Sequence, residues 1–150
     1  MPEKKVKTKK IEKTSKTAPV KADRYFEAVG RRKTAIARVR LYNHKGGISV
    51  NEKDYLKYFP TNRLQQMALS PLEKTKLNGK INVIVRVSGG GLSSQAEAVR
   101  HGLSRALVLF DANLKSTIKG LGYLRRDPRM VERKKFGLKK ARRAPQWAKR

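Results

Sequence analysis

The sequence predicts an α+β domain that carries a basic arm at each end, and three observations predict it. Apolar residues gather in the middle of the 150-residue chain. There, strand-like alternation is followed by a helical apolar period. Charge gathers at the ends: the net charge is +6 over residues 1–24, +11 over residues 25–124 and +10 over residues 125–150. We therefore divide the chain into a disordered basic extension (1–23), an α+β domain (24–124) and an extended basic tail (125–150).

The first half of the domain is expected to begin with strands. Residues 24–29 form a strand candidate, and residues 30–33 follow as a tight turn that carries three cations. Residues 34–42 alternate, which predicts a strand with one apolar face and one basic face. Its apolar face would hold Ala35, Ala37, Val39 and Leu41. After a turn at 43–47, residues 48–50 are expected to return as a short strand and complete a hairpin.

Helical pieces and one clear strand follow. Residues 54–59 and 62–69 are expected to be helical, with Pro71 ending the second piece. Residues 80–88 alternate as a strand, and Ser94 with Glu97 has the spacing of a capping box that starts a long helix. This helix has an apolar stripe made by Ala96, Val99, Leu103, Ala106, Leu107 and Phe110. His101 and Arg105 are expected to project away from the stripe, and a shorter helix is expected over residues 113–119.

Composition excludes several function classes. The chain has no cysteine and two histidines, which argues against a disulfide framework, a metal site and a cofactor. The carboxylates are few and scattered, so we expect no catalytic constellation and no small-molecule substrate. No apolar run approaches the roughly 20 residues of a membrane helix, and we expect a soluble protein without a membrane partner. The glycines at 89–91 fit a strand-to-helix turn better than a nucleotide loop, because the third glycine of that fingerprint is replaced by Ser94.

A net charge of +27 predicts a polyanionic partner. Twelve cations lie in the last 26 residues, seven of them arginine, the residue that grips phosphate bidentately. Phe136 and Trp147 are interleaved with these cations, and their rings are suited to stacking on unpaired bases. For Phe136, local packing against Met130 or Leu138 stays open as the alternative. A possible turn is expected over residues 130–134. The candidate RNA-binding residues are Arg31, Arg32, Lys33, Arg38, Arg40, Arg105, Arg125, Arg126, Arg129, Arg133, Lys134, Lys135, Lys139, Lys140, Arg142 and Arg143.

The order of motifs resembles the bacterial type of the small-subunit ribosomal protein S-nine family. The resemblance runs from about residue 24 to residue 150. It is carried by residues 25–41, Asn51 with 58–60, 83–91, 100–102 with 105–107, and the tail segments 126–127, 129–130, 132–138 and 141–146.

This resemblance implies a left-handed β-α-β crossover and a place on rRNA in the head of the small subunit, beside neighbouring head proteins. The protein would be a non-enzymatic constituent of a cytoplasmic ribosome, and an organellar ribosome stays open. The resemblance also implies that the tail threads through rRNA until Lys149 and Arg150 contact the anticodon stem-loop of the P-site tRNA. The family tip usually reads aromatic-Ser-Lys-Arg, whereas this chain has Ala148 in place of the serine.

Two alternatives from other classes stay open. A free-standing architectural protein would bind duplex DNA as well as it binds structured RNA. A small-molecule kinase is suggested by fold analogy and the glycine loop alone, and tight ATP binding by the domain would support it.

Overall fold

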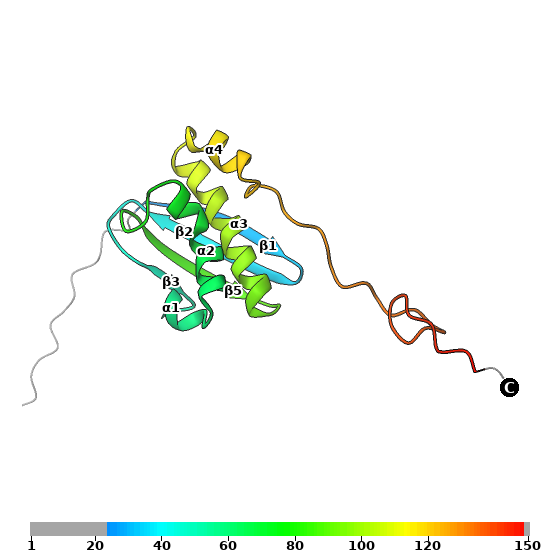
Figure 1. Cartoon of the computed structure of the whole chain (residues 1–150). Coiled ribbons are helices and arrows are strands. Elements are labelled where there is room, and N and C mark those ends of the chain that lie inside the picture. Colours follow the sequence, from blue (N-terminus) through cyan, green and yellow to red (C-terminus); the bar gives the residue numbers. More distant parts are fainter. Residues whose placement is uncertain (1–23, 149–150) are drawn as a thin grey trace, which may run out of the picture.

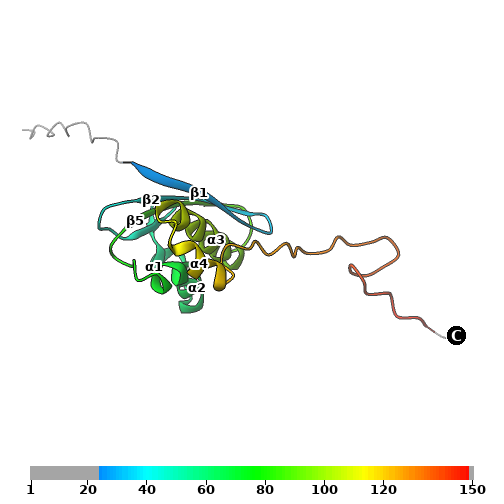
Figure 2. The same cartoon turned by 90° about the horizontal axis from the view of Figure 1, so that it is seen from above.

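The computed structural model describes residues 24–148; the expected extension over residues 1–23 and the tip residues Lys149 and Arg150 lie outside the described residues. Helices cover one face of a mixed sheet, which confirms the expected α+β class (Figures 1 and 2). The elements are β1 (Tyr25–Arg32), β2 (Ala35–Tyr42), β3 (Ile48–Val50), β4 (Lys53–Asp54), α1 (Tyr55–Tyr58), α2 (Asn62–Lys74), β5 (Asn82–Ser88), α3 (Leu92–Phe110) and α4 (Leu114–Gly120). Within the described part of the chain, the sheet has five strands in the order β1-β2-β5-β3-β4, and only the β3–β5 pair is parallel.

β1 is longer than the sequence predicts. The expected turn at residues 30–33 is wrong, because Gly30 pairs with Ala37 and Arg32 pairs with Ala35 in one continuous ladder. The reason is the close approach of α3, which only glycine permits here. A Cβ on Gly30 would lie 1.9 Å from the Ala98 carbonyl oxygen and 2.3 Å from the Gly102 nitrogen. The turn comes later, at Lys33, whose φ is +50°.

The predicted hairpin between β2 and β3 is also wrong. β5 occupies the edge of β2 over seven residue pairs, and β3 lies parallel to β5 on its other side. The ladder continues through the Asn51 side chain, which acts as an extra peptide group. Its amide nitrogen donates to the Val87 carbonyl oxygen at 2.9 Å, and its oxygen accepts from the Val87 N–H at 2.8 Å.

α2 continues through Pro71 to Lys74, so the prediction that Pro71 ends this helix is wrong. A proline inside a helix leaves the carbonyl four residues earlier without its N–H donor. That carbonyl belongs to Met67, and the Ser70 hydroxyl donates to it at 2.9 Å. A side chain therefore replaces the missing backbone donor.

α3 carries the predicted apolar stripe: Ala96, Val99, Leu103, Ala106 and Leu107 are buried and Phe110 packs at the edge of the core. The predicted capping box is wrong, since α3 begins at Leu92 after Gly91 with no side-chain cap, and Ser94 is buried in its first turn. His101 and Arg105, which were expected to project away from the apolar stripe, lie beside it on the flank of α3 that faces β1. Both contact β1, because α3 lies across this strand.

The tail leaves the domain after α4 and runs away from it (Figure 1). Its described residues contain no helix or strand. A turn was expected over residues 130–134, but the turn lies later in the tail, over residues 135–143. There the Leu138 N–H donates to the Lys135 carbonyl oxygen, and the Lys139 N–H donates to the Arg143 carbonyl oxygen at 2.8 Å. No helix within residues 24–148 is long and apolar enough to cross a membrane.

Candidate nucleic-acid interface

The helices leave one face of the sheet uncovered (Figure 2), and the outward side chains on this face are largely basic. Alternation along β1, β2 and β5 turns their apolar residues toward α3 and their polar residues outward. The outward cations are Arg31, Arg38, Arg40 and Arg86. We call this surface, together with Ile36 and Ile84 between the cations, the open sheet face.

Glu27 orders two of these arginines. Its carboxylate oxygens lie 2.9 Å from Arg40 Nε and 3.4 Å from Arg38 Nε. The hydrogen bond to Glu27 raises the pKa of Arg40, and the Arg40 guanidinium lies 4.9 Å from the centre of the Tyr25 ring. One carboxylate shared by two guanidinium groups leaves excess positive charge on this face.

Arg86 is a candidate that the sequence reasoning missed. It lies directly opposite Arg38 in the β2–β5 ladder. With Ile36, Val87 and Ser88, these two arginines line a shallow hollow of about 180 Å³. The signal was present in the alternation of residues 82–88, which places Arg86 on the same face as Arg38 once the two strands are paired.

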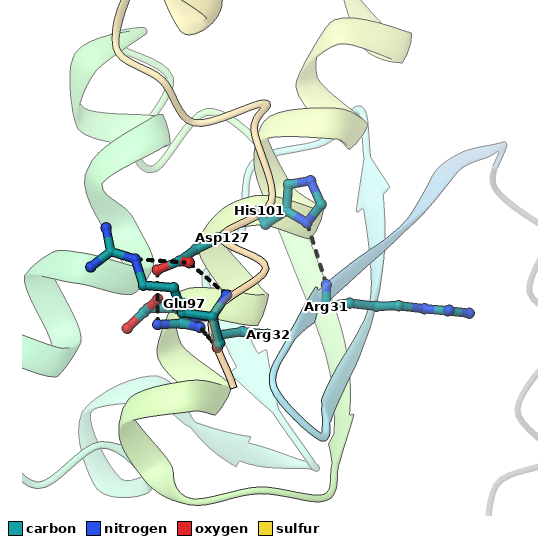
Figure 3. Close-up of polar contacts among 6 residues, drawn as sticks. Arg31, Arg32, Glu97, His101 and Asp127 are labelled. Carbon is teal, nitrogen blue, oxygen red and sulfur yellow. Dashed lines mark hydrogen bonds and ion pairs between the residues drawn. The ribbon is translucent and has the colours of Figure 1, made fainter. Parts of the chain in front are cut away.

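Arg31 and Arg32 are neighbours in sequence but serve different surfaces. The Arg31 side chain extends outward (Figure 3). Arg32 lies on the helix side, where its Nε is 2.5 Å from Glu97 and an Nη is 2.9 Å from Asp127 of the tail. Its side chain is only 12% exposed. The structure therefore engages Arg32 in ion pairs within the chain, on the side of the sheet opposite to Arg31.

Arg105 and His101 join α3 to β1. Arg105 donates to the Val29 carbonyl oxygen at 2.6 Å, and the Arg31 N–H donates to His101 Nδ1 at 3.3 Å. Burial lowers the pKa of His101, and the positive charge of Arg105 lowers it further. A neutral imidazole is the form that can accept the Arg31 hydrogen bond.

The tail presents a second basic surface. All ten of its described cations are exposed: Arg125, Arg126, Arg129, Arg133, Lys134, Lys135, Lys139, Lys140, Arg142 and Arg143. Glu132 lies 2.8 Å from Arg142 and 3.0 Å from Lys135, and these hydrogen bonds lower the pKa of its carboxyl. Phe136 is 98% exposed and Trp147 is 81% exposed.

The glycine loop and the titratable residues offer no competing site. Gly89 and Gly90 have φ of +73° and +64°, and a Cβ on Gly89 would lie 2.5 Å from the Thr34 carbonyl oxygen. Tight packing against the β1–β2 turn therefore explains these glycines. Among residues 24–148, no three His, Asp or Glu side chains gather in a group that could hold a metal ion.

Comparison with known protein families gives a match over most of the chain. The family is described as Ribosomal protein S9/S16, and its sequence model matches residues 30–150. The match spans most of the domain and the whole tail, including both basic surfaces. The chain therefore belongs to the ribosomal protein S9/S16 family and is a structural constituent of the small ribosomal subunit that binds rRNA.

Proposed function

We propose that the chain binds rRNA in the head of the small subunit through two surfaces, the open sheet face and the tail. One observation carries this proposal: the ten described tail cations are all exposed, and two carboxylates, Asp127 and Glu132, accompany them. Phosphate groups are the partners that would neutralise such a segment. Neighbouring head proteins and a cytoplasmic ribosome complete the proposed setting.

The open sheet face supplies the first contact. Arg31, Arg38, Arg40 and Arg86 project from the sheet, and Glu27 holds the guanidinium groups of Arg38 and Arg40 in place before RNA arrives. Ile36 is 45% exposed and Ile84 is 37% exposed between them. A surface that mixes arginine with apolar patches suits an RNA backbone with unpaired bases better than a regular duplex.

The tail supplies the second contact, and its binding is coupled to ordering. Like charges repel along a free tail, and neutralisation by phosphate removes this repulsion. Phe136 and Trp147 have no apolar partner to bury them in the described chain, so bases of rRNA are their proposed stacking partners. Lys33, at the β1–β2 turn, and the ten tail cations are the proposed phosphate contacts here.

At the end of this path, Lys149 and Arg150 are proposed to contact phosphates of the P-site tRNA anticodon stem-loop. Contacts to the phosphate backbone position the tRNA and carry no sequence information. Both residues lie outside the described part of the chain. The support for this contact is the direction of the tail away from the domain and the family resemblance of the tip (Figure 1).

Two experiments test these contacts separately. Sedimentation of a cell lysate through sucrose in high salt should leave the chain with the small subunit, and a chain released to the top would contradict rRNA docking. Deletion of Lys149 and Arg150 should leave assembly intact and weaken P-site tRNA binding by about 1–3 kcal/mol, the scale of one or two charged hydrogen bonds. The control exchanges the two residues, Lys149→Arg with Arg150→Lys, which keeps both charges and should bind tRNA normally. Unchanged tRNA affinity after the deletion would refute the tip contact.

A further inference from the structure

A cavity of about 440 Å³ lies at the root of the tail, beside α3. It is lined by Arg100 of α3 and, from the chain that follows α4, by Gly122 and residues 125–129. Four arginines line it, Arg100, Arg125, Arg126 and Arg129, together with the carboxylate of Asp127. This volume is in the range of sites that hold a small ligand, roughly 300–1,000 Å³. A cavity with this lining is suited to an anion.

The single carboxylate in this lining is already committed. Asp127 lies 2.9 Å from an Arg32 Nη on its other side and accepts the Arg129 backbone N–H at 2.9 Å (Figure 3). The backbone hydrogen bond from Arg129 lowers the pKa of Asp127, and the charge of Arg32 contributes. Asp127 also lies 3.6 Å from Arg129 Nε, so this one ionised carboxylate is shared between Arg32 and Arg129 and faces four arginines around the cavity.

Arg32 connects the tail to α3. Besides Asp127, it contacts Glu97 of α3, and an Nη donates to the Arg129 carbonyl oxygen at 2.5 Å. We call Arg32, Glu97 and Asp127 the root anchor. The root anchor joins the start of the tail to the domain, whereas the rest of the tail runs away from the domain. It holds the tail arginines near Arg100. The Arg100 guanidinium is in turn placed 5.3 Å from the centre of the Tyr123 ring.

We propose that this cavity is a binding site for a backbone phosphate of RNA and that the root anchor assembles it. The proposal rests on the proposed function, because it takes RNA as the partner. Guanidinium groups from two sides can grip one phosphate through bidentate, charge-assisted hydrogen bonds. The anchor holds these groups in place within the chain itself, which removes part of the ordering cost from the binding step.

The decisive variant is Asp127→Asn, because two explanations predict opposite signs. If the tail binds RNA only as a flexible polycation, removing a negative charge tightens binding. If the root anchor assembles the site, the same change weakens binding, by about tenfold, the scale of one charge-assisted hydrogen bond. Glu132→Gln is the matched control, since it removes the same charge from a tail carboxylate that pairs with Arg142 and Lys135 outside the cavity lining. It should bind RNA as tightly as the unaltered chain or more tightly.

Two further variants locate the phosphate. Arg100→Ala should weaken binding of the full chain to a single-stranded uridine oligonucleotide by about tenfold. Arg63→Ala, which removes an exposed arginine of α2 away from the cavity, should cause a smaller loss. Equal losses for the two variants would overturn the site. If inorganic phosphate saturates the site but the oligonucleotide does not bind there, the assignment to RNA is overturned.

A measurement without RNA tests the anchor itself. Trypsin should cleave the full chain after Arg125, Arg126 and Arg129 faster in the variants Asp127→Asn and Glu97→Gln than in the unaltered chain. The Asp127→Asn variant should keep the thermal unfolding midpoint of the domain. Unchanged cleavage at these positions would overturn the anchor. Failure of this site can be told apart from failure of the proposed function. If the chain sediments with the small subunit but the Asp127→Asn variant binds RNA normally, only the site is refuted.

Discussion

The domain and the tail of this protein use apolar residues in opposite ways. In the domain, Phe59 and Leu41 have no exposed surface, and Leu103 is 1% exposed. In the tail, Phe136 is 98% exposed and Trp147 is 81% exposed. The domain thus buries its apolar side chains against one another, whereas the described tail leaves its rings and cations exposed. Apolar residues build a core in the domain, whereas for the exposed rings of the tail the contacts with RNA are a proposal.

The largest expected difference compares one ring from each region. Phe59→Ala should reduce the free energy of unfolding by about 3–5 kcal/mol, because it empties a fully buried site. Phe136→Ala removes the same ring from an exposed site and should change stability by less than about 0.5 kcal/mol. Urea unfolding of the full chain without RNA measures both. A loss for Phe136→Ala that matches the loss for Phe59→Ala would show that the tail has a core of its own.

The next largest expected effect tests the close packing between β1 and α3 in the domain. Gly30→Ala would place a methyl group 1.9 Å from the Ala98 carbonyl oxygen, which forces β1 and α3 apart. We expect a loss of about 3 kcal/mol in unfolding free energy. Gly47→Ala is the control, since nothing lies within 4 Å of its added Cβ. If both variants unfold at the same urea concentration, the strand–helix contact is looser than described.

A smaller effect concerns polar groups that the domain satisfies internally. Asn51→Ala leaves the N–H and C=O of Val87 without partners, so we expect a loss of about 1–3 kcal/mol in unfolding free energy. Asn62→Ala, at the exposed start of α2, should leave stability unchanged or slightly raised. Thermal unfolding followed by circular dichroism compares the two. Equal midpoints would mean that water replaces the Asn51 amide at no cost.

The smallest expected effect is a pH dependence of domain stability. Because burial and Arg105 lower the pKa of His101, the unfolded chain takes up this proton first as the pH falls below about 6.5. Arg100 and Arg126 also lower this pKa, and a hydrogen bond with the Leu124 backbone opposes them. Stability should therefore decrease from pH 6.5 toward the lower folded-state pKa, and urea unfolding across that window measures the slope.

Two variants assign this slope. His101→Gln should remove the contribution of this histidine, whereas His44→Gln should retain it. A slope that persists in full after His101→Gln would contradict the assignment.

The elements that the sequence predicted well are those with long, regular patterns. The structure confirms the strands predicted from alternation in residues 34–42 and 80–88 and the helix predicted from the apolar stripe in residues 94–110. These predictions succeed because burial of one face gives a strand or a helix its characteristic apolar period. The errors fall where a distant segment decides. Gly30 was predicted to lie in a turn, but its role is to let Gly102 of α3 approach β1 closely. Pro71 was predicted to end a helix, but the Ser70 hydroxyl supplies the missing hydrogen-bond donor.

The candidate site divides in the same way. Charge density predicted the tail and the basic face of β2 as candidates, since cations without neighbouring acids favour a polyanionic partner. Arg86 was missed because its proximity to Arg38 exists only after β5 pairs with β2. Arg32 was grouped with its sequence neighbours, although its carboxylate partners are 65 and 95 residues away along the chain.

The sequence by itself determined the α+β class and a partner rich in phosphate, and it predicted the division between core and tail. These follow from composition and short periods, which act on neighbouring residues. The tertiary structure alone decided the strand order, the direction of His101 and Arg105, and the pairing of Arg32 with Glu97 and Asp127. Such contacts join residues far apart in the chain, and the free energy that selects them comes from packing and ion pairing that exist only once the segments have met.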